Sequence, residues 1–142
     1  MAHKSGVGEA ARDRFLQDAF VYVAASRKLE LIKIGWSKGA QKENRLNSLN
    51  RDGYGGASDW LLLYERKYAN AEQVEFAAHT FLKAFEVRVD YIRLGHGVRV
   101  KAKELFRCNY ADACKAIERT KHAPLENRYE RHDAKTGYNY RA

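Results

Sequence analysis

Two hydrophobic runs near the start of the chain predict a β-hairpin. Residues 20–25 alternate and are rich in β-forming side chains, and residues 29–36 read as the returning strand. The polar residues 26–28 between them suit a short connection. A third apolar run at 60–68 predicts a largely buried strand, so we expect a small, mainly antiparallel three-stranded sheet.

Apolar residues at helical spacing predict helices around this sheet. A short amphipathic helix over 8–18 would lead into the first strand. After the hairpin, Ser37 is the expected N-cap of a helix over 38–50, which turns Leu46 and Leu49 toward the sheet.

The most regular helical pattern begins at Asn70, where Gln73 three positions later resembles a capping box. The expected buried face of this helix contains Val74, Ala77, Ala78, Phe81, Leu82 and Phe85. We therefore expect one side of the helix to pack on the sheet.

The last third of the chain carries a hairpin signal and then a helix signal. Residues 87–94 and 98–101 flank a glycine-rich turn and predict a second hairpin. Asn109 is the expected cap of a last helix that runs to about Arg119. The tail after Pro124 has no apolar periodicity, so we expect it to be mobile or to order only against a partner.

Composition supports one folded domain of the α/β (α+β) class. The 142 residues are 45% hydrophobic and include a single proline, which is typical of a globular protein. We assign residues 1–120 to this domain, with the leading helix within 1–18, and residues 121–142 to a basic, flexible C-terminal tail. Helices would flank the three-stranded sheet, and a basic hairpin and a C-terminal helix would be added to it.

The formal net charge of +8 favours a polyanionic partner, of which nucleic acid is the commonest for a small basic domain, and the alternative is a surface charge that only keeps the protein in solution. Cys108 and Cys114 are the two cysteines, and no neighbouring Cys or His completes a zinc set, so we expect reduced, structural thiols. The start of the chain has no apolar signal core, and no segment is apolar enough to span a membrane. We therefore expect a cytoplasmic protein without a membrane partner.

Lys33 interrupts the apolar pattern of the second strand with a charge. Period-2 geometry places it on the face of Leu31 and Gly35, opposite Ile32 and Ile34. Either this face lines a catalytic cleft, or the strand is simply exposed on one side.

Glu75 and His79 lie four positions apart on the helix that begins near Asn70, and therefore stack on one flank beside its apolar face. The pair is either a site or an ordinary surface interaction. Glu72 competes with Glu75, but it lies one turn earlier and has no histidine partner.

Basic residues are frequent in the second predicted hairpin, which could lie along a phosphate backbone or enter a groove. The candidate DNA-binding residues there and after the first hairpin are Lys38, Lys42, Arg88, Arg93, Arg99, Lys101 and Lys103. Any one of them can equally be a solvated surface charge.

The order of residues in the first half of the chain resembles the GIY-YIG nuclease superfamily. Tyr22 lies in the first predicted strand, Lys33-Ile34-Gly35 stands where that superfamily has Tyr-Ile-Gly in the second, and Arg45 follows on the next helix. The Lys-Ile-Gly spelling is similar to the T5orf172/MUG113 branch. The resemblance implies a site built from this strand pair and that helix.

The resemblance extends over the second half of the chain. Glu75 matches the metal-binding glutamate of the superfamily, and His79 matches a histidine that T5orf172 domains carry one turn later. Glu104 and Phe106 resemble the Glu-x-Phe ending of T5orf172 domains. Glu104 would approach the metal or pin the second hairpin to the sheet, and we favour the structural role.

The implied activity is metal-dependent DNA endonuclease chemistry with Mg²⁺ or Mn²⁺ as cofactor and double-stranded DNA as substrate. Tyr22 and Lys33 would handle the attacking water, because a tyrosine of pKa about 10 needs a nearby cation to act at neutral pH. Arg45 would clamp the scissile phosphate. Glu75 would bind the metal, and His79 would assist proton transfer or positioning.

Three alternatives remain open at this stage. The chain could be a DNA-binding module without turnover, since lysine replaces the second tyrosine of the motif. It could bind or cleave RNA, because backbone contacts do not separate the two polymers. Within the nuclease interpretation, either Tyr22 or His79 could accept the proton.

Overall fold

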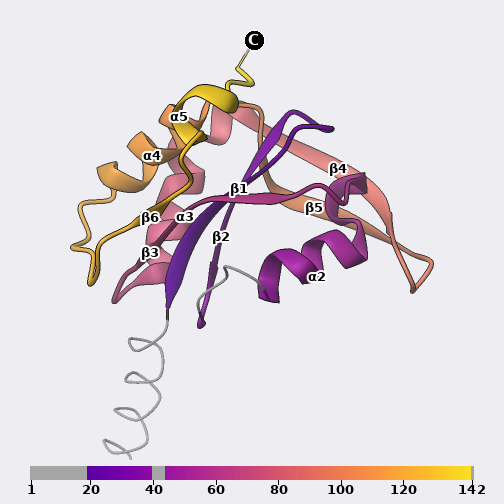
Figure 1. Cartoon of the computed structure of the whole chain (residues 1–142), viewed down its shortest axis with the longest axis horizontal. Coiled ribbons are helices and arrows are strands. Elements are labelled where there is room, and N and C mark those ends of the chain that lie inside the picture. Colours follow the sequence, from indigo (N-terminus) through magenta and orange to yellow (C-terminus); the bar gives the residue numbers. More distant parts are fainter. Residues whose placement is uncertain (1–18, 40–43, 142) are drawn as a thin grey trace, which may run out of the picture.

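The computed structural model describes residues 19–39 and 44–141 and shows one antiparallel sheet with helices on both of its faces (Figure 1). The strands are β1 (Phe20–Ser26), β2 (Leu31–Ser37), β3 (Leu61–Lys67), β4 (Glu86–Arg93), β5 (Val98–Phe106) and β6 (Tyr129–Glu130). Their order across the sheet is β4-β5-β2-β1-β3-β6.

The prediction of a three-stranded sheet is wrong in its extent. The three predicted strands occupy the centre as β2-β1-β3, while the second hairpin joins one edge and β6 joins the other. The hairpin joins because β5 continues to Phe106 and pairs with β2 at Ile32 and Lys33. Periodicity within one strand does not reveal such a partner, so the hairpin was expected beside the sheet rather than in it.

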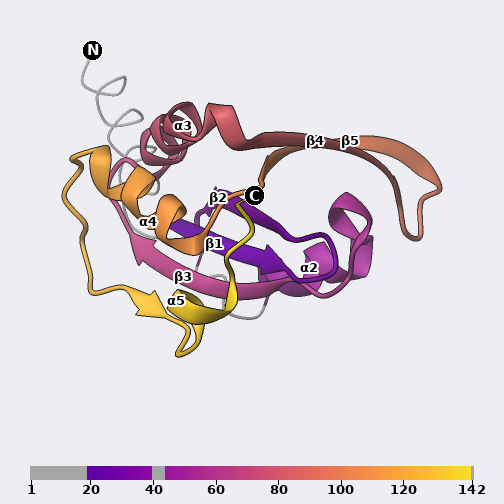
Figure 2. The ribbon, with the colours of Figure 1, turned by 90° about the horizontal axis from the view of Figure 1, so that it is seen from above.

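The helices within the described residues are α2 (Asn44–Asp52), α3 (Ala71–Phe81), α4 (Tyr110–Arg119) and α5 (Ala134–Gly137), with short 3₁₀ turns η1 (Tyr54–Gly56) and η2 (Lys83–Phe85). Helices α3 and α4 lie together on one side of the central strands, and α2 lies on the other side below the long β4-β5 hairpin (Figure 2).

Alternation along the central strands separates two hydrophobic clusters. Val21 and Val23 of β1 belong to the cluster beneath α3 and α4, while Tyr22 and Ala24 belong to the cluster that contains Leu46 of α2. The predicted inward orientation of α2 is therefore confirmed. Each fully buried side chain of this size contributes about 1.5–3 kcal/mol relative to exposure, so the register of β1 and β2 is strongly determined.

Two helix starts differ from the prediction. Ser37 ends β2, where its hydroxyl donates to the carbonyl of Gly39, so it is not the expected N-cap. Asn70 precedes α3 without a side-chain capping bond, and its amide group contacts the ring of His122 instead. The predicted cap at Asn109 is confirmed by a reciprocal capping box with Asp112. The expected leading helix at 8–18 and residues 40–43 lie outside the described residues.

The buried face of α3 is narrower than its periodicity predicted. Ala71, Val74 and Ala78 are buried, but Phe81 at the end of the helix is 48% exposed. The chain then tightens into η2, which carries Phe85 to a partly buried position beside the core.

The C-terminal segment, for which a flexible tail is expected from sequence, packs against the rest of the fold over residues 129–140. Strand β6 pairs with β3, Tyr138 is fully buried, and its carbonyl accepts a hydrogen bond from the amide of Tyr110. These contacts use single, widely spaced side chains, which produce no helical or strand period in the sequence. Within the described part of the chain, none of the helices has the length and apolar character that crossing a membrane requires.

Candidate functional site

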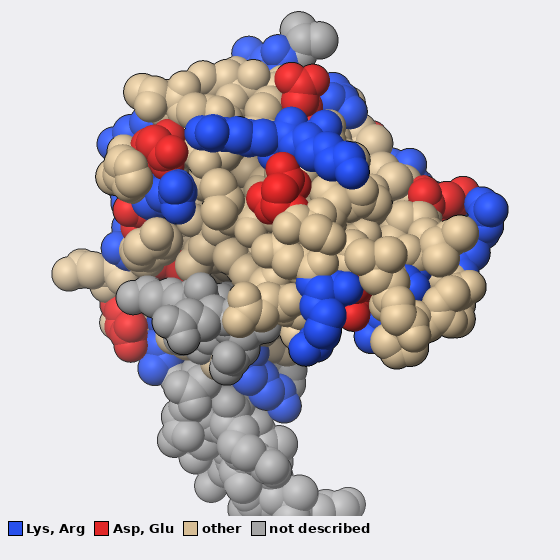
Figure 3. All heavy atoms as spheres, turned by 45° about the vertical axis from the view of Figure 1, so that its right-hand side comes forward, with Lys and Arg blue, Asp and Glu red and all other residues tan. Residues whose placement is uncertain are grey.

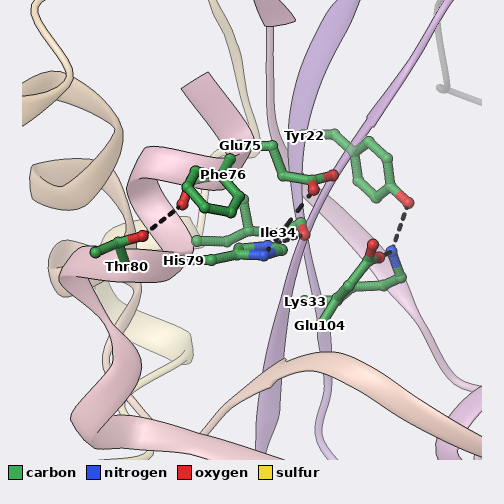
Figure 4. A network of polar contacts seen from close by, with 8 residues as sticks. All are labelled: Tyr22, Lys33, Ile34, Glu75, Phe76, His79, Thr80 and Glu104. Atoms are coloured by element: carbon green, nitrogen blue, oxygen red, sulfur yellow. Dashed lines mark hydrogen bonds and ion pairs between the residues drawn. The ribbon is translucent and has the colours of Figure 1, made fainter. Parts of the chain in front are cut away.

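The first part of the site is a buried contact between the two strands of the first hairpin. Tyr22 pairs with Gly35 across the β1-β2 ladder, and Lys33 lies two positions earlier on the same face. The side chains of Tyr22 and Lys33 are 0% and 1% exposed, and the Lys33 Nζ donates a hydrogen bond of 2.9 Å to the Tyr22 hydroxyl (Figure 4). The prediction that Lys33 shares the face of Tyr22 is therefore confirmed.

Gly35 provides the space for this contact. A Cβ atom at Gly35 would lie 2.6 Å from Cζ of Tyr22 and 2.8 Å from Nζ of Lys33, which is closer than real Cβ contacts allow. The side chains of Tyr22 and Lys33 therefore require a glycine at position 35.

Glu104 completes this part of the site from a β-bulge in β5. Between the pairs Val87–Leu105 and Val89–Ala102, two residues of β5 stand opposite one residue of β4. The bulge interrupts the alternation of β5 at Glu104, whose carboxylate reaches Lys33 Nζ at 2.7 Å. The structure thus gives Glu104 a direct contact within the site.

Lys33 is a permanent cation in this environment. Burial disfavours the ammonium form, but the negative charge of Glu104 and the Tyr22 oxygen outweigh that effect and raise the pKa of Lys33 above its usual value. Lys33 therefore cannot act as a base at neutral pH. The ring of Tyr54 lies 5.3 Å from the same ammonium, and burial raises the pKa of Tyr54 to about 12.

The second part of the site comes from α3, which runs along the edge of β2. The ladder between β2 and β5 covers only Ile32 and Lys33, so the next backbone groups of β2 on that edge need other partners. The ring of His79 donates through Nε2 to the Ile34 carbonyl at 2.8 Å, and Glu75 accepts a hydrogen bond from the Trp36 backbone.

The spacing of this pair matches the spacing of the strand. Four helical residues advance about 6 Å, and two strand residues advance about 6.6 Å. Side chains at i and i+4 of α3 can therefore reach successive polar groups along the edge of β2. The i, i+4 pair was predicted from sequence, but its strand partner was not.

Because the Ile34 carbonyl can only accept, His79 carries its proton on Nε2 and its lone pair on Nδ1. Nδ1 lies 3.9 Å from Oε1 of Glu75. Burial lowers the pKa of His79, so the ring is neutral at physiological pH. His79 is thus a neutral imidazole with an available acceptor nitrogen beside a carboxyl group.

The carboxyl group of Glu75 binds its proton unusually tightly. Burial, followed by the negative charge of Glu104, raises the pKa of Glu75 to about 7. In Figure 4 the Glu75 side chain extends from α3 toward the strand pair that carries Tyr22 and Lys33. The charges of Lys33 and Glu104 in the first part of the site therefore influence the protonation of Glu75 in the second part.

The remaining predicted site residues differ in what the structure describes. Arg45 lies in the first turn of α2, and its side chain falls outside the described residues, as does all of Lys42. Lys38 is exposed just after β2.

The basic hairpin is only partly available to a phosphate backbone. Arg88, Arg93 and Lys101 lie 3.3, 3.2 and 4.0 Å from carboxylates of Glu86, Asp52 and Asp90. Arg99 and Lys103 are exposed. Figure 3 shows Lys and Arg side chains in several separate groups with acidic side chains among them. On the face that Figure 3 shows, charge alone therefore does not define a continuous binding surface.

The donor set for a metal ion is small. Among the described residues, no group of three or more His, Cys, Asp and Glu side chains gathers to hold one. Glu75 and Glu104 are the two carboxylates of the site, and Mg²⁺ commonly uses one or two carboxylates together with water and phosphate oxygens. The contact between Glu104 and Lys33 depends on the bulge in the register between β4 and β5, which a pattern within one strand does not reveal.

Comparison with known proteins gives one family. The model of the T5orf172 domain matches residues 19–133, which is most of the chain and includes every residue of the site described above. No curated protein and no solved structure gives a match. The chain therefore belongs to the T5orf172 domain family.

Proposed function

We propose that this protein is a metal-dependent DNA endonuclease with a GIY-YIG-like site. The observation that carries the proposal is the convergence of two groups of polar side chains, Tyr22-Lys33-Glu104 and Glu75-His79, where β5 separates from β2. Membership of the T5orf172 family supports it, since that domain is associated with nuclease-like, DNA-related function.

Phosphodiester hydrolysis needs a proton acceptor for water and positive charge for the phosphate. The Nδ1 atom of neutral His79 and the hydroxyl oxygen of Tyr22 are the two candidates for the proton acceptor, since the carboxylates of the site would hold the metal. Lys33 supplies a fixed cation next to Tyr22, held in place by Glu104. Arg45 would add a second positive charge from α2, as the family resemblance implies.

Glu75, with Glu104 as a second carboxylate, would hold Mg²⁺ or Mn²⁺. The donor chemistry fits, because a buried carboxyl group whose pKa is raised to about 7 by burial and a second carboxylate gains from a cation in place of its proton. When bound, the ion would stabilise negative charge on the phosphate and the leaving oxygen.

The test is cleavage of supercoiled plasmid with Mg²⁺ or Mn²⁺ by the wild type and by Glu75→Gln. Glutamine keeps an oxygen that can accept the hydrogen bond from the Trp36 amide, so the fold should persist. It removes the anionic metal ligand, so cleavage should fall by about a hundredfold or more. Glu118→Gln is the matched control, because Glu118 is an exposed carboxylate of α4 that belongs to neither part of the site and should leave cleavage unchanged.

Equal cleavage by wild type and Glu75→Gln would overturn the metal assignment. Intact plasmid together with a persistent gel shift would identify a binding module. That alternative has a structural basis, because Glu75 and His79 also complete the edge of β2 and are needed there without catalysis. Parallel RNA substrates distinguish a ribonuclease, for which the same backbone chemistry applies.

A further inference from the structure

A hollow of about 420 Å³ opens on the outer side of Glu75. Among the described residues, its lining consists of Trp36, Glu72, Gln73, Glu75 and Phe76. Glu75 therefore belongs both to the candidate catalytic site and to this hollow. A molecule whose reacting phosphate lies at Glu75 places its neighbouring atoms at the hollow.

Phe76, one of the two aromatic residues of the lining, is not accounted for by packing. Phe76 directly follows Glu75 on α3 (Figure 4). Its side chain is 73% exposed. Leaving such a ring in water forgoes about 1.5–3 kcal/mol of burial, so the core gains little from it. Trp36 lines the same hollow from the end of β2, where it packs partly against the core. Two aromatic side chains from two different elements thus meet one solvent-open space.

The polar part of the lining fits a nucleobase better than a phosphate. Glu72 would repel an anion, but its carboxylate oxygens can accept hydrogen bonds from the exocyclic amino groups of bases. Gln73 can both donate and accept. The size suits a small planar ring system, and aromatic walls with a few polar groups are the usual lining of such a site.

We propose that this hollow receives an unpaired nucleobase adjacent to the scissile phosphate, with Phe76 as the main stacking surface. The inference rests on the proposed nuclease function and adds a substrate class to it: nucleic acid that is single-stranded, mismatched or bulged at the cleavage position. A base inside a regular duplex is stacked between its neighbours and has to be extruded to reach the hollow, at a cost in free energy.

The first test compares cleavage of oligonucleotide duplexes that are fully paired or carry one unpaired nucleotide at successive positions. The wild type should prefer an unpaired nucleotide at a fixed distance from the cut, and Phe76→Ala should reduce that preference about tenfold to a hundredfold. The matched control is Phe81→Ala, because Phe81 is also an exposed phenylalanine of α3 but does not line this hollow. The same loss in both variants would overturn the proposal.

A second measurement is independent of cleavage. The chain has two tryptophans, and Trp60 is 2% exposed, so quenching of fluorescence by an added oligonucleotide reports mainly on Trp36. In a chelator, a single-stranded oligonucleotide should quench saturably, and an abasic strand of the same length and charge should not. Equal quenching by the two strands, or the same quenching in Trp36→Phe, would refute base binding.

The two proposals can fail separately. Cleavage that depends on Glu75 but is the same for Phe76→Ala and wild type on every substrate would leave the nuclease in place and refute the base site. Absence of cleavage with base-dependent quenching of Trp36 would refute the nuclease and support a site for unpaired bases.

Discussion

Replacing Gly35 by alanine tests whether the buried contact between Tyr22 and Lys33 matters for activity. The added Cβ would lie 2.5 Å from the Tyr22 hydroxyl oxygen, 2.6 Å from its Cζ and 2.8 Å from Lys33 Nζ. An ordinary contact needs about 3.5–4 Å, so the tyrosine or the ammonium has to move by about 1 Å.

The two consequences of this displacement can be estimated separately. Overpacking of this kind costs about 1–3 kcal/mol in the free energy of unfolding. Misplacing catalytic groups by about 1 Å costs about a hundredfold in rate. We therefore expect Gly35→Ala to fold with a reduced urea midpoint and to cleave plasmid about a hundred times more slowly than wild type. Gly39→Ala is the matched control, because a Cβ at Gly39 meets no atom of the described residues within 4 Å.

Reduced stability with unchanged cleavage would show that Tyr22 and Lys33 serve the fold and not the reaction. Unchanged stability and unchanged cleavage would refute the packing argument itself. Cleavage should be measured at a temperature where both variants are fully folded, as judged by circular dichroism.

Further predictions concern the buried charges and the C-terminal segment. Lys33→Met removes the cation that contacts Tyr22 and Glu104; because Glu104 is 38% exposed and can be solvated, we expect about 1–3 kcal/mol of destabilisation in urea unfolding but loss of cleavage. The pKa of Glu75 is raised on folding, so its folded state binds the proton more tightly and stability falls as pH rises from about 4.5 to about 7. In the presence of a metal chelator, the free energy of unfolding should fall between about pH 4.5 and about pH 7 by about 2–3 kcal/mol less in Glu75→Gln than in wild type. Parallel curves of unfolding free energy against pH for the two proteins would contradict this prediction. Tyr138→Ala should lower the free energy of unfolding by about 3–5 kcal/mol, whereas Tyr138→Phe keeps the buried ring and should cost less than about 1 kcal/mol; equal urea midpoints for the two would disprove the packing of the tail.

Local patterns were sufficient for the centre of the fold. The alternation around Lys33 placed it beside Tyr22 because the side-chain period of a strand is a local property. The i, i+4 spacing likewise placed Glu75 and His79 on one flank of α3. These features depend on a few consecutive residues, and the chain encodes them directly.

Features that depend on pairing between distant segments were not predictable in this way. The contact of Glu104 with Lys33 needs both the β4-β5 bulge and the β5-β2 ladder. The packing of the C-terminal segment depends on Tyr138, whose side chain fills a space formed by other elements. Neither a register shift nor a single buried ring leaves a period in the sequence.

The edge of β2 beyond its short ladder with β5 links the site to the behaviour of the protein in solution. Unpaired strand edges recruit strands of other molecules and cause aggregation or domain swapping. Glu75 and His79 occupy the groups of Ile34 and Trp36 that would otherwise be offered to such a strand. Alanine at both positions would therefore not give an inert, monodisperse protein, but one that self-associates through β2, and the conservative replacements Glu75→Gln and His79→Gln are the ones that separate chemistry from colloidal stability.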